Sequence, residues 1–237
     1  MDYELWTKHL RKLVLFLLLV LCPWSMVHGP AFAQSLPPTQ LKGIECFERY
    51  KVDEFPTVFK TWPLQRGDAK KIYKVQEENG KKYLAAFDDK DLSKQIFREF
   101  DWNIKAFPYL RWKWRARALP KGAAENNGAT NDSACGVYVL FGRTTGTALK
   151  FTWSTTLPVG TVFEKKPGEM VMKILDSGSK KLNQWRANSI DVPKMYEELL
   201  KKPLKREPTG FAILTDGNAT HSPAACDYAD FEISSVP

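Results

Sequence analysis

The chain has 237 residues, a formal net charge of +8 and three histidines, of which only His221 lies beyond the first 33 residues. One histidine excludes a histidine-cluster metal site and makes any catalytic triad or dyad depend on His221. The length after residue 33 suits one domain with a hydrophobic core. In a protein expected to be exported, the basic charge favours anionic polymers over nucleic acid as partners.

The N-terminal segment has the features of a signal peptide. Residues 8–12 are rich in lysine and arginine, residues 13–21 are an unbroken apolar run, and residues 31–33 are Ala-Phe-Ala, which suits cleavage after Ala33. The apolar run is shorter than the about 20 residues of a membrane span. We therefore expect a cleaved signal peptide over residues 1–33, a mature chain with no membrane span, and a periplasmic or secreted location. An uncleaved anchor is the alternative.

The rest of the chain is expected to form a leader and one domain. Residues 34–45 contain Leu36-Pro37-Pro38 and predict a flexible leader. Residues 46–237 show no repeat or linker that would mark a second domain, and short β-rich stretches recur there between turns that carry Gly, Asn, Asp and Pro. Asn79-Gly80 is a hairpin turn between two of them. The predicted strands are 72–76, 83–87, 95–101, 109–117, 136–142, 147–154, 170–175, 185–190, 210–214 and 228–233.

Ten or so short strands in one domain predict an all-β fold, namely a two-layer antiparallel β-sandwich that is jelly-roll-like. One segment departs from this pattern. Asp191 is a favourable helix N-cap, Pro193 suits the first helical turn, and Pro203 ends the segment. We therefore expect one short surface helix near residues 193–202.

Residues 109–117, Tyr-Leu-Arg-Trp-Lys-Trp-Arg-Ala-Arg, alternate strictly between apolar and basic side chains. In a strand, Leu110, Trp112 and Trp114 point to one side, which is expected to pack on the core. The opposite side is purely cationic and is expected to face water. Several such cations together would bind carboxylates or phosphates. The candidate ligand-binding cations are Arg111, Lys113 and Arg115.

Beyond residue 33 the chain has three cysteines, Cys46, Cys135 and Cys226, so at most one intramolecular disulfide can form. An oxidising compartment favours pairing. Cys135 and Cys226 each lie at the start of a predicted strand, and we favour a disulfide between them. Three buried thiols are the alternative.

Two polar segments and one tryptophan are further candidates for ligand binding. Trp153 lies near the end of a predicted strand, where its ring suits a sugar-binding cleft, although tryptophans on a sheet face are usually core residues. The loop over residues 118–134 is long, and ordered long loops are often functional. The loop over residues 214–228 would hydrogen-bond a sugar, with an Asx-type turn as the alternative. The polar candidates in these loops are Asn131, Asp132, Asp216, Asn218 and His221.

Paired carboxylates are the one enzymatic chemistry that the sequence supports. Asp132 with Asp216 or Asp227 would cleave a glycosidic bond if the two groups lay about 5 Å or 6.5–9.5 Å apart. Turn-forming or solvated aspartates are the alternative. Asp216, Asn218 and Asp227 carry oxygen ligands that suit Ca²⁺, although their spacing matches no calcium loop. No other cofactor is expected.

Five segments resemble, in the same order, a family of bacterial exported proteins known as domain of unknown function 3047. They are Tyr109-Leu-Arg-Trp-Lys-Trp-Arg-Ala-Arg-Ala-Leu-Pro, residues 130–142, residues 153–161, residues 213–220 and residues 224–231. The resemblance extends from about Phe47 to Ile233. It implies an exported bacterial protein and brings no activity with it. Its most distinctive segments contain Asn131, Asp132, Trp153, Asp216, Asn218 and Asp227.

These observations predict a non-catalytic binding module for a glycan or an anionic polymer. The chain has no Gly-x-Ser-x-Gly elbow, phosphate loop or dinucleotide fingerprint, which disfavours an enzyme. One alternative is a carbohydrate-active hydrolase or lyase that uses paired carboxylates. Another is an envelope scaffold that binds a second protein through an exposed sheet edge. The sequence does not predict an oligomeric state.

Overall fold

The computed structural model describes residues 39–142 and 146–237. The predicted signal peptide and the first part of the predicted leader lie outside these residues. Within them, no helix combines the length and the hydropathy needed to cross a membrane. The elements are β1 (Leu41–Glu45), β2 (Lys60–Thr61), α2 (Arg66–Ile72), β3 (Tyr73–Glu78), β4 (Lys81–Asp88), β5 (Ile96–Glu99), β6 (Tyr109–Ala118), β7 (Ser133–Phe141), β8 (Thr147–Ser154), β9 (Val162–Lys166), β10 (Met170–Ser177), β11 (Arg186–Asp191), α3 (Val192–Leu200), β12 (Gly210–Asp216) and β13 (Ala224–Ser234).

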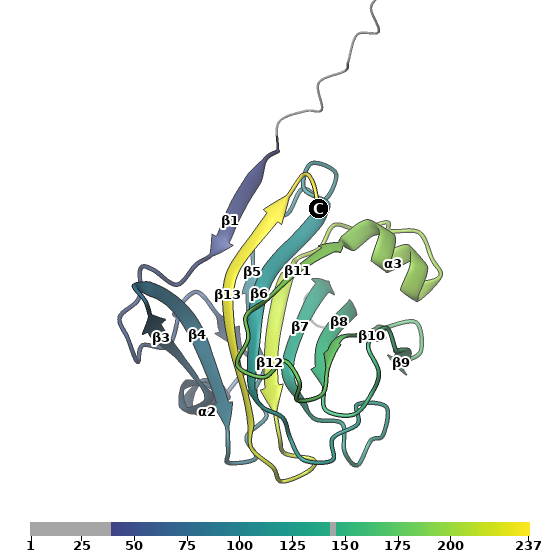
Figure 1. Ribbon diagram of the computed structural model, residues 1–237. Helices are drawn as coiled ribbons and strands as arrows, with labels where there is room; N and C mark the ends of the chain where they lie inside the picture. Colours follow the sequence, from purple (N-terminus) through teal and green to yellow (C-terminus); the bar gives the residue numbers. More distant parts are fainter. Residues whose placement is uncertain (1–38, 143–145) are drawn as a thin grey trace, which may run out of the picture. The chain divides into compact units, whose positions relative to one another are not determined.

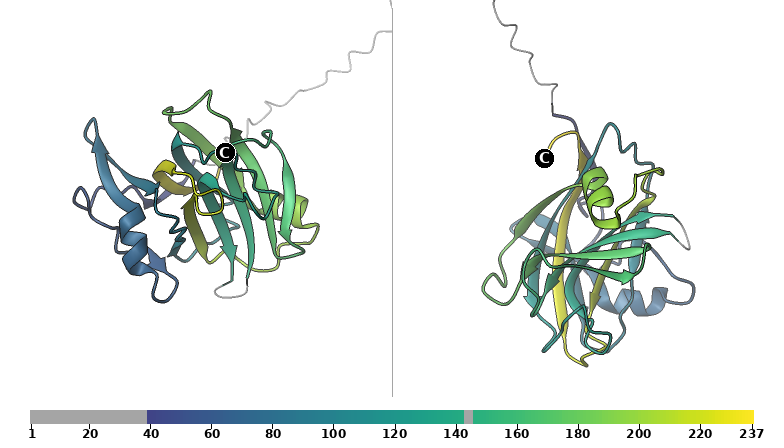
Figure 2. Two further views of the ribbon diagram at one scale, coloured as in Figure 1. Left: turned by 90° about the horizontal axis from the view of Figure 1, so that it is seen from below. Right: turned by 90° about the vertical axis from the view of Figure 1, so that its right-hand side faces the viewer.

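The strands form two sheets (Figure 1). The six-stranded sheet has the order β11-β6-β13-β4-β3, and β1 also pairs with β13. The seven-stranded sheet has the order β2-β5-β12-β7-β8-β10-β9. The two sheets lie face to face, as the further views show (Figure 2). The predicted all-β, two-layer, jelly-roll-like sandwich is confirmed, with one exception to antiparallel pairing, since β8 and β10 run parallel.

The core lies between the sheets, and most of its largest fully buried side chains are aromatic. The apolar side of β6 faces inward as predicted: Trp112 packs against Phe151 at 6.1 Å, and Trp114 against Trp153 at 6.4 Å between ring centroids. Strict alternation explains this, because one side of a strand can be buried while the other stays wet. Cys135 and Cys226 form a disulfide that joins β7 in one sheet to β13 in the other.

Three local expectations are corrected. Residues 41–45 of the predicted flexible leader form β1, because their backbone pairs with the C-terminal half of β13. A second helix, α2, precedes β3 and buries Ala69 and Ile72. The edge strand β9 was also not predicted. The helix expected near 193–202 is present as α3, and the Asp191 side chain accepts a hydrogen bond of 3.0 Å from the Lys194 N–H as its cap.

A bulge in β13 controls which side chains reach the outer face of the six-stranded sheet. The register against β6 shifts between Ala229 and Glu232, and Asp230 has a positive φ of 53°. One extra residue restores the inward orientation for Phe231, which stacks on Phe211 at 4.3 Å. As a result, Asp230 and Glu232 point outward beside the basic side chains of β6.

Candidate functional site

A groove opens on the outer face of the six-stranded sheet where β13 changes its neighbour. Residues 224–228 of β13 pair with β4, and residues 231–234 pair with β1. Two adjoining pockets of about 570 and 340 Å³ lie at this change of partner. They share Lys113, Ala187 and Asp230, and we call them together the charged groove.

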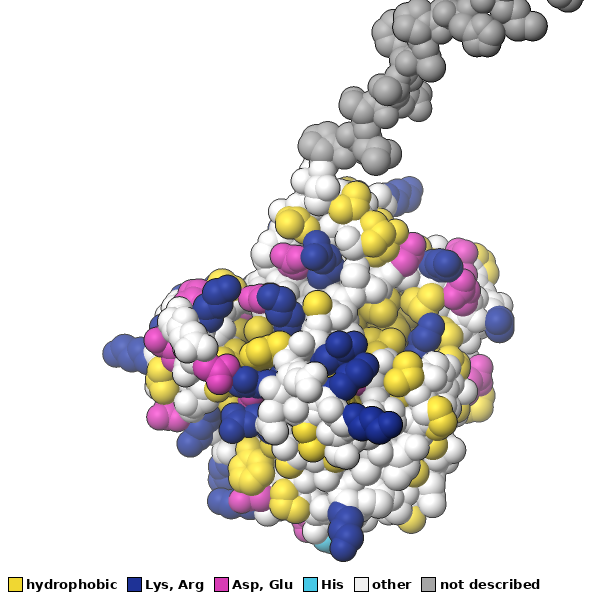
Figure 3. Space-filling view, viewed as in Figure 1, with side chains coloured by type: hydrophobic (Ala, Val, Ile, Leu, Met, Phe, Trp, Pro, Cys, Tyr) yellow, Lys and Arg dark blue, Asp and Glu magenta, His cyan; other side chains and the backbone are white. Residues whose placement is uncertain are grey.

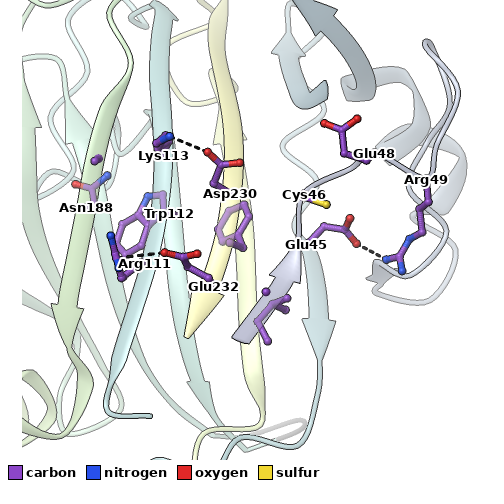
Figure 4. Close-up of a pocket in the computed structure, with 14 residues that line it drawn as sticks. Glu45, Cys46, Glu48, Arg49, Arg111, Trp112, Lys113, Asn188, Asp230 and Glu232 are labelled. Carbon is purple, nitrogen blue, oxygen red and sulfur yellow. Dashed lines mark hydrogen bonds and ion pairs between the residues drawn. The ribbon is translucent and has the colours of Figure 1, made fainter. Parts of the chain in front are cut away.

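Two of the three predicted cationic side chains of β6, Arg111 and Lys113, line this groove, and each has an acidic partner. Lys113 Nζ lies 2.9 Å from Asp230 Oδ2, and Arg111 Nε lies 3.3 Å from Glu232 Oε1. Figure 4 shows both ion pairs joining β6 to β13, with Cys46, Glu48 and the Glu45–Arg49 pair on the other side of the pocket. These four groups of the β6 and β13 pairs are between a quarter and a half exposed, so a ligand can reach them.

Arg115 is held more tightly than its neighbours on β6. Its Nε and one terminal nitrogen each lie 2.8 Å from Asp227 Oδ2, and its other terminal nitrogen lies 2.8 Å from Glu78 Oε2. Its guanidinium also covers the rings of Trp185, at 4.6 Å, and Tyr83, at 5.4 Å. These cation–π contacts hold two aromatic rings at one end of the groove.

The outer face of the six-stranded sheet is therefore not a cationic surface. The expectation of a purely cationic face at Arg111, Lys113 and Arg115 is wrong, because β6 pairs with the acidic strand β13. The bulge turns Asp230 and Glu232 toward Lys113 and Arg111, and Asp227, which precedes the bulge, bonds Arg115. Figure 3 shows basic and acidic side chains interspersed over β1, β3 and β4 on the same side of the molecule. What the groove presents is a mixture of donors and acceptors held at fixed positions.

The opposite outer face, on the seven-stranded sheet, buries a polar cluster. Asp216 Oδ1 accepts a hydrogen bond of 3.0 Å from the Ser133 N–H, and the Lys150 ammonium donates to Ser133 Oγ at 3.0 Å. Burial raises the pKa of the Asp216 carboxyl to about 6, and the Lys150 charge acts against that rise. Gly136 makes the arrangement fit, since a Cβ there would lie 3.1 Å from Lys150 Cε and 3.0 Å from the Leu214 carbonyl oxygen.

Lys150 and Ser133 are hydrogen-bonded as the lysine and serine of a catalytic dyad would be, but a substrate cannot reach them. Ser133 is fully buried and Lys150 is 2% exposed. Glu125, in the loop that precedes β7, lies near the same end of the sheet and accepts a hydrogen bond of 2.5 Å from Ser154 Oγ. Burial raises the pKa of the Glu125 carboxyl. The cluster secures the loop and offers no access for a reacting group.

The three residues of the paired-carboxylate hypothesis do not meet in one open site. Asp132 is fully buried and accepts hydrogen bonds from the Ala219 and Thr220 N–H groups and from the Thr220 hydroxyl. Asp216 lies on the same side, but Asp227 belongs to the other sheet and bonds Arg115. Asp132 and Asp216 lie near enough for their charges to interact, but they are only 0% and 5% exposed, so this pair is not open to a substrate. Asp227 lies apart from both, and a pair of Asp132 with Asp227 is not formed.

A calcium site at Asp216, Asn218 and Asp227 is not formed either, because the two aspartates lie on different sheets and bond other groups. Within residues 39–142 and 146–237, no group of three or more His, Cys, Asp or Glu residues is arranged to hold a metal ion.

The remaining predicted ligand-binding residues lie apart from the charged groove. Trp153 belongs to the core: it is fully buried and its indole N–H donates to the Gly178 carbonyl oxygen at 3.1 Å, so its proposed role in a cleft is wrong. His221 is exposed and pairs with Asp91 at 2.7 Å, a hydrogen bond that raises the pKa of its imidazole. Asn131 bonds the Gly128 carbonyl oxygen, and Asn218 is exposed in the turn after β12.

Several residues of the groove were not predicted. The contacts of Asp230 and Glu232 with β6 depend on the bulge in β13, which no local sequence pattern indicates. Tyr83 and Trp185 come from segments about 100 residues apart that meet only in the folded sheet, with their rings 5.7 Å apart. The alternation Lys150, Thr152 and Ser154 along β8 was the one sequence pattern that indicated a polar outer face on the second sheet.

Comparison with known proteins gives a family and several distant similarities. No curated protein matches the chain. Among solved structures, a family 29 carbohydrate-binding module from Piromyces equi is 10% identical, with a TM-score of 0.36 over 83% of this chain and 91% of that one. The K1 cleaved adhesin domain of Lys-gingipain from Porphyromonas gingivalis is 12% identical, with a TM-score of 0.37 over 83% and 98% of the two chains. An agarase, AgWH50C, has the same identity and TM-score over 83% and 25%.

At these identities and TM-scores, the solved structures say nothing about what this chain binds. The family comparison is more informative, because its match covers most of the described domain. The model of the family described as "Protein of unknown function (DUF3047)" matches residues 58–232, and the chain therefore belongs to this family.

Proposed function

We propose that this protein is a non-catalytic glycan-binding module and that the charged groove holds the glycan. The proposal rests on two neighbouring ion pairs that line an open groove. These ion pairs are Arg111–Glu232 and Lys113–Asp230. Sugar hydroxyls both donate and accept hydrogen bonds. A surface that offers guanidinium and ammonium donors next to carboxylate acceptors, already held in place, suits them at little cost in side-chain entropy.

The aromatic end of the groove supports the same ligand class. Trp185 is partly exposed and lines the smaller pocket with Tyr83, so an apolar sugar face can stack on the indole. Arg115 holds both rings from below, which reduces the ordering needed on binding.

The neutralised cations favour a glycan over an anionic polymer. A polyanion binds where several cations lack partners, since it replaces their counterions. Here Arg111, Lys113 and Arg115 each have a carboxylate partner in the folded protein. The proposed ligand is therefore a neutral glycan or one with few charges. We also propose that the protein reaches it outside the cytoplasm, by way of the N-terminal signal segment.

The test is retention of the purified protein on a panel of immobilised neutral and acidic glycans. Trp185→Ala is expected to weaken retention of the bound glycan about tenfold, which corresponds to about 1.4 kcal/mol, and Asp230→Asn to weaken it by breaking one ion pair. Trp62→Ala is the matched control, because Trp62 is an exposed tryptophan just after β2 of the other sheet. All three variants should keep the wild-type melting temperature within a few degrees.

Two outcomes would contradict the proposal. If no glycan on the panel is retained, or if Trp62→Ala weakens retention as much as Trp185→Ala, the charged groove is not the glycan site. Release of reducing ends from the retained glycan would contradict the non-catalytic part of the proposal.

A further inference from the structure

A second, chemically different pocket lies on the outer face of the seven-stranded sheet. It has a volume of about 300 Å³ and crosses several strands. Its floor is formed by Leu140 of β7 and Ala148 of β8, and Trp62 and Phe97 stand at one side with their ring centroids 5.6 Å apart. The turn between β9 and β10 stands at the other side, through Lys166 and Glu169. We call this pocket the aromatic cleft.

The part of this face that borders the aromatic cleft is apolar although it points away from the core, unlike the part that carries Lys150 and Asp216. Tyr138, Ala148 and Ala212 form a buried hydrophobic cluster of their own, separate from the core between the sheets. Along each strand of a sandwich, apolar residues that face the core normally alternate with polar residues on the outer face. An apolar outer face that borders a pocket is typical of a ligand site. Partly buried side chains that pack against this cluster are Phe97, Leu140, Met170 and Leu214.

The charges at the rim indicate an uncharged ligand. Glu99 already forms an ion pair with Lys60. Lys166 and Glu169 carry opposite charges at the two ends of one tight turn, where the Glu169 N–H donates to the Lys166 carbonyl oxygen at 3.0 Å. A charged ligand would gain attraction from one of these groups and repulsion from the other, in addition to its desolvation cost.

The volume and the rings set the size and shape of the ligand. A cavity of about 150 Å³ lined by apolar side chains binds benzene, so about 300 Å³ suits a molecule of roughly a dozen non-hydrogen atoms. The exposed indole of Trp62, which is 39% accessible, and the neighbouring ring of Phe97 favour a flat ring over a flexible chain. We propose that the aromatic cleft binds a small, uncharged, ring-bearing apolar molecule. This site is distinct from the charged groove and does not depend on it.

Calorimetric titration of the purified protein with three small molecules tests the proposal. The probes are 2-naphthalenemethanol, which is apolar and neutral, 2-naphthoate, which is apolar and anionic, and glucose, which is neutral and polar and of the same size as the first. We expect 2-naphthalenemethanol to bind at least tenfold more tightly than 2-naphthoate. Glucose is expected not to bind in the cleft and therefore not to displace 2-naphthalenemethanol. No binding of 2-naphthalenemethanol, tighter binding of 2-naphthoate, or displacement by glucose would overturn the proposal.

Two variants place the binding in the cleft. Trp62→Ala removes an exposed ring and is expected to weaken binding of 2-naphthalenemethanol at least tenfold with little effect on folding. Ala148→Phe fills the floor and is expected to abolish binding. Trp185→Ala, in the charged groove, is the matched control and should bind like the wild type. Equal binding by Trp62→Ala and the wild type would show that 2-naphthalenemethanol binds elsewhere, and the proposal would fail even if Ala148→Phe did not fold.

Discussion

Asp216 lies in an environment unlike that of an ordinary surface aspartate. Its carboxylate is 5% exposed, accepts one hydrogen bond from the Ser133 N–H, and lies near the Lys150 charge and the Asp132 charge. Removal from water raises its pKa to about 6, and Lys150 offsets part of that rise. The folded protein therefore holds this proton more tightly than the unfolded chain does.

This shift predicts how stability changes with pH. A carboxyl group whose pKa is raised on folding contributes stability that is complete below its unfolded value near 3.8 and is lost as pH rises through about 6. The loss attributable to Asp216 is about 2 kcal/mol between pH 4 and pH 7. Asp216→Asn keeps an acceptor for the Ser133 N–H and cannot ionise. Urea denaturation from pH 4 to pH 8 should show that the free energy of unfolding falls more steeply with pH for the wild type than for Asp216→Asn. If the two proteins lost stability in parallel, the raised pKa of Asp216 would not be the cause.

At the residue scale, the alternation of apolar and basic residues predicted which way the side chains of β6 point, but not which residues they contact. The inward side of residues 109–117 was predictable from one strand, because its period is local. The partners of Arg111, Lys113 and Arg115 were not, since they depend on the register of β6 against β13. For Trp153 the alternation was informative but not used. Trp153 lies on the same side of β8 as Leu149 and Phe151, and this position already indicated that it belongs to the core.

The pairing of β6 with β13 allows two ion pairs of the same sheet to be compared. Asp227→Asn leaves the nearly buried Arg115 with only the partly exposed Glu78 as a charged partner. We expect this to cost about 3 kcal/mol, because a nearly buried charge that has lost its buried partner is expensive. Glu232→Gln leaves Arg111 in partial contact with water and is expected to cost less than about 1 kcal/mol. Denaturation curves of both variants check the order, and equal costs would contradict it.

At the element scale, the sequence predicted strands better than their order. The hairpin at Asn79-Gly80 was predictable, because both residues adopt positive φ values that only certain residues accept readily. The parallel pair of β8 and β10 was not, because β9 is short, polar and at the edge, and nothing in residues 155–169 fixes which strand lies next to β8. The charged groove could not be predicted either. It forms where the first half of β13 pairs with β4 and the second half with β1, and no local pattern indicates this change of pairing.

At the scale of the whole molecule, the disulfide is the covalent link between the two layers. Cys135 and Cys226 are 91 residues apart in sequence and join β7 to β13. Closing a loop of that length in the unfolded chain stabilises the folded state by about 4–5 kcal/mol in the chain-entropy model. We expect Cys135→Ala with Cys226→Ala to lower the free energy of unfolding by about 2–5 kcal/mol. Cys46→Ser, at an exposed free cysteine, is the control and should change it by less than about 0.5 kcal/mol.

The same link bears on where the protein is proposed to act. Disulfides persist in oxidising compartments, which agrees with the proposed export through residues 1–33. If thiol labelling showed full reduction while the denaturation curve stayed unchanged, the disulfide would not be what holds the two layers together.

The two proposed sites lie on opposite outer faces, and this predicts that they act independently. Coupling between sites needs an element with two arrangements that both ligands bias. Between these faces lies a packed layer in which Phe211 stacks on Phe231 and Trp114 meets Trp153, and a closely packed interior resists small displacements. The affinity for 2-naphthalenemethanol should therefore change less than about twofold when the charged groove is saturated with its glycan. Titration with and without the glycan measures this, and a tenfold change would show that the two sheets move against each other on binding.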